Sequence, residues 1–305
     1  MAGAFSQVDL SQLPPPAVVE ALDYETILAA MVADLQARTD ANGVPLFTAL
    51  VESDPAFKVL EVAAYREMLL RQRVNDAARA VMIASATGSD LDQIAANYGV
   101  TRLLVSPADD TTIPPTPAVY EADDELRART TLSLEGYTSA GSQGSYIYHA
   151  LSASGQVKDV SATSPVPGQV VVYVLSRDGQ GTASLDLITA VQLALNDDKV
   201  RPMTDQVTVM SASIVPYQVT AELVVMSGPD ASVVLEAARA SIDSYTAAQH
   251  RMGRDVTLSG VYAALHQPGV QQVNLASPAG NLSIGDGEAP FCTAITLTAS
   301  VAANA

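Results

Sequence analysis

Three residue types are scarce in this sequence, which has one cysteine, three lysines and no tryptophan among 305 residues. A single cysteine, Cys292, excludes a disulfide within the chain, so folding does not require an oxidising compartment. With only four phenylalanines but 48% apolar residues, the chain should build aliphatic cores from Ala, Val and Leu. No apolar run reaches the roughly 18 residues of a membrane span, and the N-terminal segment lacks the features of a signal peptide. We therefore expect a soluble protein made in the cytoplasm.

Positive charge is also scarce, since 16 Lys and Arg residues stand against 33 Asp and Glu residues, for a net charge of -17. Binding to nucleic acid or to an anionic membrane depends on clustered Lys and Arg side chains that neutralise phosphate groups. A chain this acidic is a poor candidate for either role. The composition therefore argues against nucleic-acid partners.

The sequence contains no motif typical of a catalytic, cofactor or metal site. His149, His250 and His266 lack metal-site spacing, and no Gly-x-Ser-x-Gly elbow is present for a serine nucleophile. The loop at residues 141–145 could offer helix amides to an anion, but it lacks the Gly-Lys-Ser/Thr of a nucleotide loop and is typical of a helix cap. The acidic turn at residues 285–288 has too few spaced oxygens for an EF-hand. The sequence predicts no catalytic residue, no cofactor and no metal ion.

The most distinctive segment is a long run of helix-forming residues at positions 55–86. Asp54 can cap this helix, Pro55 suits its first position, and Gly88 could end it in a left-handed conformation. Ion pairs are expected between Glu67 and Arg71 and between Arg73 and Asp76. At 100° per residue the apolar side chains form three rows, so the helix should be buried on all sides. The rows are Phe57, Leu60, Ala64, Met68, Ala78 and Met82; Val62, Tyr65, Leu69, Ala80 and Ile83; and Val59, Ala63, Leu70, Val74, Ala77 and Val81.

Two shorter helices are expected beside this long one. The first starts at Asp23 and runs to about residue 39, and the second, at residues 89–98, is capped by Ser89 and ended by Gly99. The first has four apolar residues at 4-3-4 spacing, which suits either a coiled-coil seam or an amphipathic helix packed inside its own domain. Together the two are too short to cover three apolar rows, so we expect another chain to supply part of the cover. Aspartate at Leu69 or Met68 should then abolish assembly. The predicted protein-interface residues are Tyr24, Leu28, Met31, Leu35, Leu60, Ala64, Tyr65, Met68, Leu69, Arg73 and Val81.

The fold class predicted for the whole chain is α+β, with an N-terminal helical domain containing one very long helix and then two tandem α+β units with small sheets. The predicted parts are an extended arm at residues 1–19, a helical domain at 20–105, and α+β domains at 106–216 and 217–305. Prolines between residues 103 and 120 indicate a linker. The predicted strands are 157–163, 170–175, 207–215, 219–226, 272–276 and 294–298, and the helices are 123–135, 146–153, 185–196, 233–249 and 258–267.

An internal similarity relates the two α+β units. A helix-to-strand segment in the first unit shares seven identities with one in the second. They align Tyr148, Ala150, Leu151, Gly155, Val160, Ser164 and Pro165 with Tyr262, Ala264, Leu265, Gly269, Val273, Ser277 and Pro278.

Five segments, at residues 64–102, 114–121, 164–168, 197–205 and 250–255, closely resemble J-type baseplate assembly (wedge) proteins of contractile phage tails, the baseplate J-like family. The resemblance covers nearly the whole chain. It implies a structural wedge subunit that joins a smaller I-type wedge protein and a second copy of itself through a helical bundle. It also implies a ring around the central hub, contacts with neighbouring wedge, hub and sheath-initiating proteins, a part in sheath triggering, and assembly in the host bacterial cytoplasm.

Two other classes of function are weighed against this one. An enzyme, such as a hydrolase with a helical cap over an α+β body, would need a catalytic constellation, which the sequence does not offer. A receptor-binding tip protein would be expected to carry a lateral pocket or a repeat array, which is also not evident. The structural role is therefore the prediction.

Overall fold

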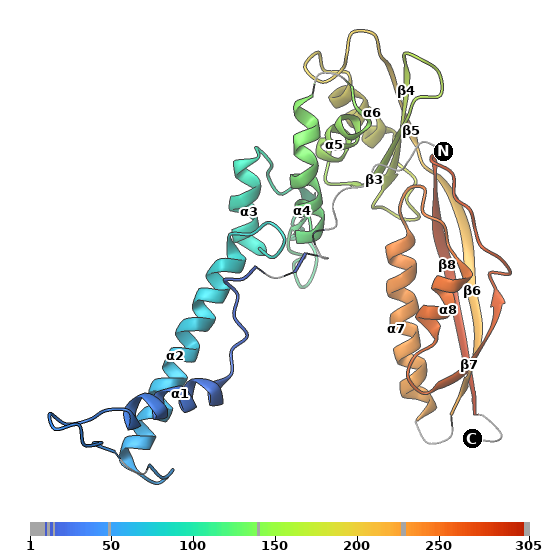
Figure 1. Cartoon of the computed structure of the whole chain (residues 1–305). Coiled ribbons are helices and arrows are strands. Elements are labelled where there is room, and N and C mark those ends of the chain that lie inside the picture. Colours follow the sequence, from blue (N-terminus) through green and yellow to red (C-terminus); the bar gives the residue numbers. More distant parts are fainter. Residues whose placement is uncertain are drawn as a thin grey trace. The chain divides into compact units, whose positions relative to one another are not determined.

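The computed structural model describes residues 10, 13–14, 16–47, 50–138, 141–226 and 230–301 (Figure 1). The chain divides into two compact units, a helical unit of residues 7–101 and a second unit that contains residues 102–305. Both α-helices and small sheets are present, which confirms the predicted α+β class. Most of the arm predicted at residues 1–19 lies outside the described residues. The predicted four-part division stays a prediction.

The helical unit contains α1 (Tyr24–Gln36), α2 (Pro55–Ala80) and α3 (Gly88–Asn97), which Figure 1 draws in blue to teal. Asp23 caps α1 by accepting a hydrogen bond from the Thr26 amide, and Asp54 caps α2 by accepting one from the Ala56 amide. The cap at Asp54 and the helix start at Asp23 are confirmed predictions. Gly99, whose φ is 70°, follows the last turn of α3 as predicted.

Helix α2 has 26 residues and ends at Ala80, so the predicted end at residue 86 is wrong. It is still much longer than the average helix of about 11 to 12 residues. After Ala80 the hydroxyl of Ser85 donates a hydrogen bond of 2.9 Å to the Arg79 carbonyl, which favours a turn over a continuing helix. The β-branched residues Val81 and Ile83 further lower helix propensity there.

Helix α3 also begins differently from the prediction. Thr87 occupies its cap position without a side-chain cap hydrogen bond, and Ser89, the predicted cap, lies inside the helix. Gly88 does have a positive φ, of 53°, but it opens α3 instead of closing α2. The prediction of a left-handed conformation at Gly88 is therefore confirmed, but the prediction that Gly88 ends α2 is wrong.

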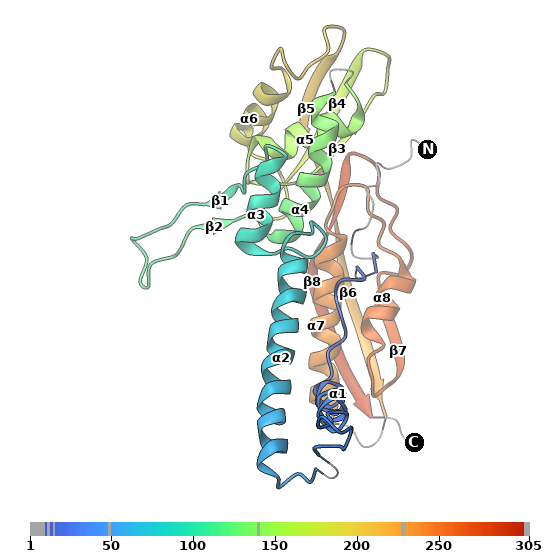
Figure 2. The same ribbon diagram turned by 60° about the vertical axis from the view of Figure 1, so that its left-hand side comes forward.

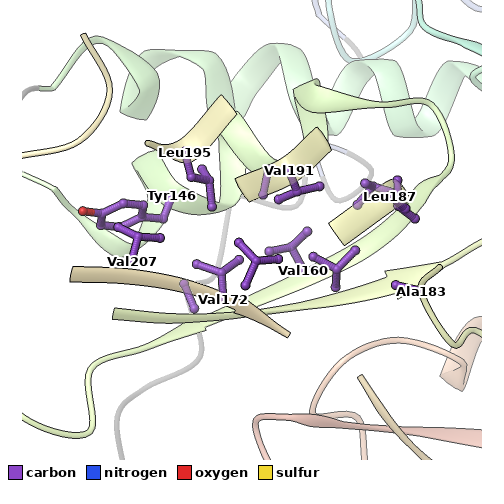
Figure 3. Close-up of a cluster of buried hydrophobic side chains, with 13 residues drawn as sticks. Tyr146, Val160, Val172, Ala183, Leu187, Val191, Leu195 and Val207 are labelled. Carbon is purple, nitrogen blue, oxygen red and sulfur yellow. The ribbon is translucent and has the colours of Figure 1, made fainter. Parts of the chain in front are cut away.

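The first α+β domain contains α4 (Asp123–Leu132), the short 3-10 helix η2 (Ser133–Tyr137), α5 (Gln143–Ala153), β3 (Val157–Thr163), β4 (Gln169–Ser176), α6 (Leu185–Leu195) and β5 (Gln206–Ser211). The sheet has the order β3-β4-β5, with β4 antiparallel to β3 and parallel to β5. Helices α5 and α6 cover one face of it. Figure 3 shows Tyr146, Leu187, Val191 and Leu195 from these helices meeting Val160, Val172 and Val207 of the strands in an aliphatic core.

The second α+β domain contains β6 (Ser213–Val225), α7 (Ala231–Gln249), α8 (Leu258–Leu265), β7 (Val270–Ser277) and β8 (Glu288–Val301). Its sheet has the order β7-β6-β8, with β6 antiparallel to β7 and parallel to β8. The core again lies between strands and helices, and it includes Leu223, Ile242, Val261 and Leu265. The two domains thus repeat one pattern, in which the central strand has one antiparallel and one parallel neighbour.

The internal sequence similarity corresponds to matching pieces of the two domains. It aligns α5 and β3 of the first domain with α8 and β7 of the second, and each pair is a helix followed by an edge strand antiparallel to the central strand. The connections differ, because β3 leads directly into its neighbour β4, whereas β7 pairs with β6, which precedes it by two helices. The repeat is therefore local.

Two predictions about strands are wrong. The strand predicted at residues 207–215 is divided at Ala212, where β5 of one sheet ends and β6 of the other begins. The Ala212 amide donates to Val174 in the first sheet, and the Ser213 amide donates to Gly287 beside the second. The proline-rich segment predicted as a linker instead contains β1 (Leu104–Ser106) and β2 (Val119–Tyr120), which pair in an antiparallel hairpin.

Candidate interaction surfaces

One of the three apolar rows of α2 is covered by α1 of the same chain. Ile27, Leu28 and Ala64 are buried at the centre of this contact. Tyr24, Met31, Val32, Phe57, Leu60 and Met68 pack around them. Of the two alternatives for the α1 seam, the structure supports packing inside its own domain.

The other two rows of α2 are exposed. Their exposed large apolar residues are Val59, Val62, Tyr65, Leu69, Leu70, Val74 and, just past the helix end, Val81, with exposed fractions between 41% and 76%. At 100° per residue the six helical positions lie about 80° to 160° around the helix axis from Ala64, on the flanks and the back of α2. Several exposed large apolar side chains on one helix are typical of an interaction site. We call these seven residues the open face of α2.

Nine of the eleven predicted interface residues belong to these two surfaces. Six of them, Tyr24, Leu28, Met31, Leu60, Ala64 and Met68, pack in the α1–α2 contact. Tyr65, Leu69 and Val81 belong to the open face, Arg73 is exposed, and Leu35 is half-buried. Of the two predicted ion pairs, Glu67 with Arg71 is confirmed at 2.6 Å. Asp76 instead accepts from Gln72 and lies 3.9 Å from Arg79.

A second site is a buried ion pair at the foot of the β1–β2 hairpin. Arg129 of α4 forms two hydrogen bonds, of 2.6 and 2.9 Å, with the carboxylate of Glu121, and each side chain is only 5% exposed. The same carboxylate accepts from the Leu103 amide, and the Glu121 amide donates to the Leu103 carbonyl. The pair therefore ties the hairpin to α4. Arg102 adds a hydrogen bond of 2.6 Å to the Glu121 carbonyl.

A second bidentate pair lies nearby. Arg177, which follows β4, donates to both carboxylate oxygens of Glu125 on α4, at 2.7 and 2.8 Å. Both pairs line a small cavity of about 80 Å³, together with Asp124, Lys158, Asp159 and Arg251. The cavity carries opposite charges in near balance, because its carboxylates already face guanidinium or ammonium groups. This arrangement fits a structural junction better than a site for a charged ligand.

At the same junction the two α+β domains meet through His250, which follows α7. Its Nε2 lies 3.2 Å from the Gln180 carbonyl and its Nδ1 lies 2.8 Å from the Lys158 ammonium group. Because a carbonyl can only accept, the proton belongs on Nε2, and Nδ1 accepts from Lys158. Burial lowers the pKa of His250, and the positive charge of Lys158 lowers it further. The neighbouring Asp159 accepts from the Met252 amide, and burial raises the pKa of its carboxyl group.

Acid should lower the stability of the folded protein through two histidines, His250 and His149. Folding lowers the pKa of His250 and of half-buried His149 below their usual 6.5, so below that value the unfolded chain binds more protons. Stability should fall as the pH drops below about 6.5 and continue to fall until the lowered pKa is passed. Asp159 acts with the opposite sign, because burial raises the pKa of its carboxyl group above the usual 3.8.

The measurement is the melting temperature of the full chain between about pH 8 and about pH 5.5, the range in which histidine titrates. The variant His250→Gln should lose part of the acid sensitivity, because its amide can still accept from Lys158 without gaining a proton. The matched control is His266→Gln at an exposed position. An unchanged acid response in His250→Gln would contradict the role given to this imidazole.

The positions considered for chemistry have structural roles in the described part of the chain. Ser142 caps α5 through the Ser145 amide, and Glu288 accepts from the Gly285 amide within its own turn. Among the described residues, no three His, Cys, Asp or Glu side chains gather closely enough to hold a metal ion. None of the described helices is both long enough and apolar enough to cross a bilayer.

Sequence reasoning missed the charged junction. The three histidines were examined only for metal-site spacing, and nothing in the sequence indicated that His250 would be buried against Lys158. A signal was present in β3, where the adjacent charges Lys158 and Asp159 interrupt an otherwise apolar and small-residue strand. Charged residues in a partly buried strand indicate partners elsewhere in the fold, although they do not name those partners.

Comparison with known proteins agrees with this architecture. Residues 52–109 match the baseplate J-like N-terminal domain, residues 138–211 the baseplate J-like central domain, and residues 217–298 the baseplate J-like C-terminal domain. The chain belongs to the baseplate J-like family. It is 51% identical over 288 residues to baseplate protein J of Escherichia phage P2, covering 94% of this chain and 95% of that protein. It is accordingly a structural protein of the phage tail baseplate.

A solved structure of the anti-feeding prophage baseplate is also similar. The match has 15% sequence identity and a TM-score of 0.41, and it covers 60% of this chain. This chain spans 44% of the length of that one.

Proposed function

We propose that this protein is a wedge subunit of the baseplate. In this proposal the open face of α2 joins a helical bundle with a smaller I-type wedge protein and a second copy of this chain. The observation that carries the proposal is the open face itself, since α1 covers only one apolar row and two rows remain exposed. Two uncovered rows suit two further helical partners, because one packed helix covers about one such stripe.

The wedges would then form a ring around the central hub, in contact with neighbouring wedge, hub and sheath-initiating proteins, and would take part in sheath triggering. Assembly would take place in the host bacterial cytoplasm. The protein would have no enzymatic activity of its own, because every charged group described at the junction has a structural partner or lies among opposite charges. Protein–protein contacts are the chemistry that the exposed surfaces support.

The test is to produce tail particles without this protein and to compare class-averaged electron micrographs with those of complete particles. Particles without the protein should lack the ring around the hub, and supplying the protein from a plasmid should restore it. A complete baseplate ring in its absence would overturn the proposal.

A further inference from the structure

The β1–β2 hairpin is an exposed arm with an ordered tip. Figure 2 shows it projecting from the side of the second unit on which α4 and α5 lie. All residues from 107 to 117 are exposed, so the arm beyond its strands is not buried by the rest of the chain. Leu104, Val119 and Tyr120 on its stem are also exposed, and Ile113 at its tip is 100% exposed. Exposed apolar residues on a protruding element are typical of a contact surface.

The foot of the arm is fixed. Gln156 donates a hydrogen bond of 2.7 Å to the Val105 carbonyl, and the buried Glu121–Arg129 pair holds the other strand. The backbone also approaches Gly155 closely, since a β-carbon added there would fall 2.2 Å from the Leu104 carbonyl oxygen. Only glycine leaves room for this approach. The arm therefore leaves the domain in a defined direction.

The tip is held by its own hydrogen bonds. Asp109 and Thr116 exchange two backbone hydrogen bonds of 2.9 Å, and the Asp109 carboxylate accepts from the Thr111 amide. The Thr112 hydroxyl lies within hydrogen-bonding distance of Asp109, Pro114 and Thr116. Ile113 is thus presented on an organised turn, which lowers the entropy lost when it enters a pocket.

The charge of the hairpin tip indicates which kind of protein surface it can bind. Asp109 and Asp110 precede Ile113 by four and three residues in the same turn segment, and the sequence has no Lys or Arg between Arg102 and Arg127. An acidic tip is attracted by a basic surface and repelled by an acidic one. A second copy of this chain, with its net charge of -17, is a poor partner for that reason.

We propose that the hairpin is a docking arm whose Ile113 enters an apolar pocket rimmed by Lys or Arg on a different baseplate protein. This contact is separate from the open face of α2, which lies in the other unit. It rests on the proposed wedge function, because it needs a partner in the assembled baseplate. The docking arm would give the wedge subunit a second attachment point, on a receiving surface that is apolar at its centre and basic at its rim.

The test uses the full-length protein in assembled particles. A photo-crosslinking amino acid at position 113 should join a different baseplate protein, at a peptide in which Lys or Arg flanks apolar residues. Ile113→Ser and Asp110→Lys should each lower particle yield about tenfold or more, which is the effect of removing an anchor residue from an interface. Asp110 is the better charge reversal, because Asp109 holds the turn together.

The controls change equivalent groups elsewhere in the same unit. Met203→Ser removes another fully exposed apolar side chain, and Asp198→Lys reverses another exposed charge. Both should assemble normally. Crosslinking to a second copy, the absence of a crosslink, or normal assembly of either hairpin variant would overturn the docking arm. The wedge function fails on a different result, a complete ring in particles that lack the protein altogether.

Discussion

Replacing Arg129 by methionine should lower the free energy of unfolding of the second unit by about 3 to 5 kcal/mol, the range measured when one partner of a buried ion pair is removed. The substitution keeps much of the apolar stem but leaves the Glu121 carboxylate buried at 5% exposure without its guanidinium partner. The cost is thus mainly the desolvation of an unpaired charge. The foot of the β1–β2 hairpin should loosen as well, because the same carboxylate accepts from Leu103.

Denaturant unfolding followed by circular dichroism measures this change. The double variant Glu121→Gln with Arg129→Met should recover a large part of the loss, because no buried charge remains. Arg239→Met is the matched control, since Arg239 pairs with Asp243 at half exposure and such pairs contribute about 0 to 1 kcal/mol. If Arg129→Met and Arg239→Met cost the same, the Glu121–Arg129 pair does not anchor the fold.

Aspartate on the open face of α2 should abolish baseplate assembly while the chain stays folded. Leu69 and Leu70 belong to two different exposed rows, so Leu69→Asp and Leu70→Asp test both proposed contacts. A charge buried in a bundle without a partner costs several kcal/mol, on the order of a hundredfold or more in affinity. The variant Met68→Asp is less informative than the sequence suggested, because Met68 packs against α1 in its own chain.

Co-purification with the wedge partner and electron microscopy of particles measure the loss, and circular dichroism of the isolated protein checks the fold. Leu69→Met and Leu70→Met are the controls, since they keep an apolar side chain of similar volume and should assemble normally. Wild-type assembly of both aspartate variants would refute the bundle.

Local chemistry explains which elements could be predicted. Asp23 and Asp54 cap helices through their own neighbours in sequence, and the alternating strand at residues 157–163 matches β3. The predictions failed where the deciding partner was distant. Residues 207–215 all favour a β-strand, so the sequence shows no break between two strands. Only the hydrogen bonds from Ala212 to Val174 and from Ser213 to Gly287 show that this segment belongs to two sheets. The proline-rich hairpin was missed because its pairing depends on Leu103 and Glu121, on either side of the prolines.

The interaction surfaces follow the same rule. Three apolar rows on one helix could be counted from the sequence, and this predicted that the chain could not cover them all. Which row α1 would cover depended on tertiary packing around Ala64. The pairing of Lys158 with His250 joins residues 92 positions apart, so no local pattern could have indicated it.

The passage from β5 to β6 gives the two sheets a mechanical connection. Ala212 is the single residue between them, and both of its neighbours are held in strands. One residue supplies about 3.5 Å of chain even when fully extended. A pull on β6 can therefore move it only a short distance before it also pulls on β5. Rotation of one strand relative to the other is limited to the two backbone dihedrals of Ala212. A force applied to either sheet is therefore transmitted to the other through the backbone at Ala212.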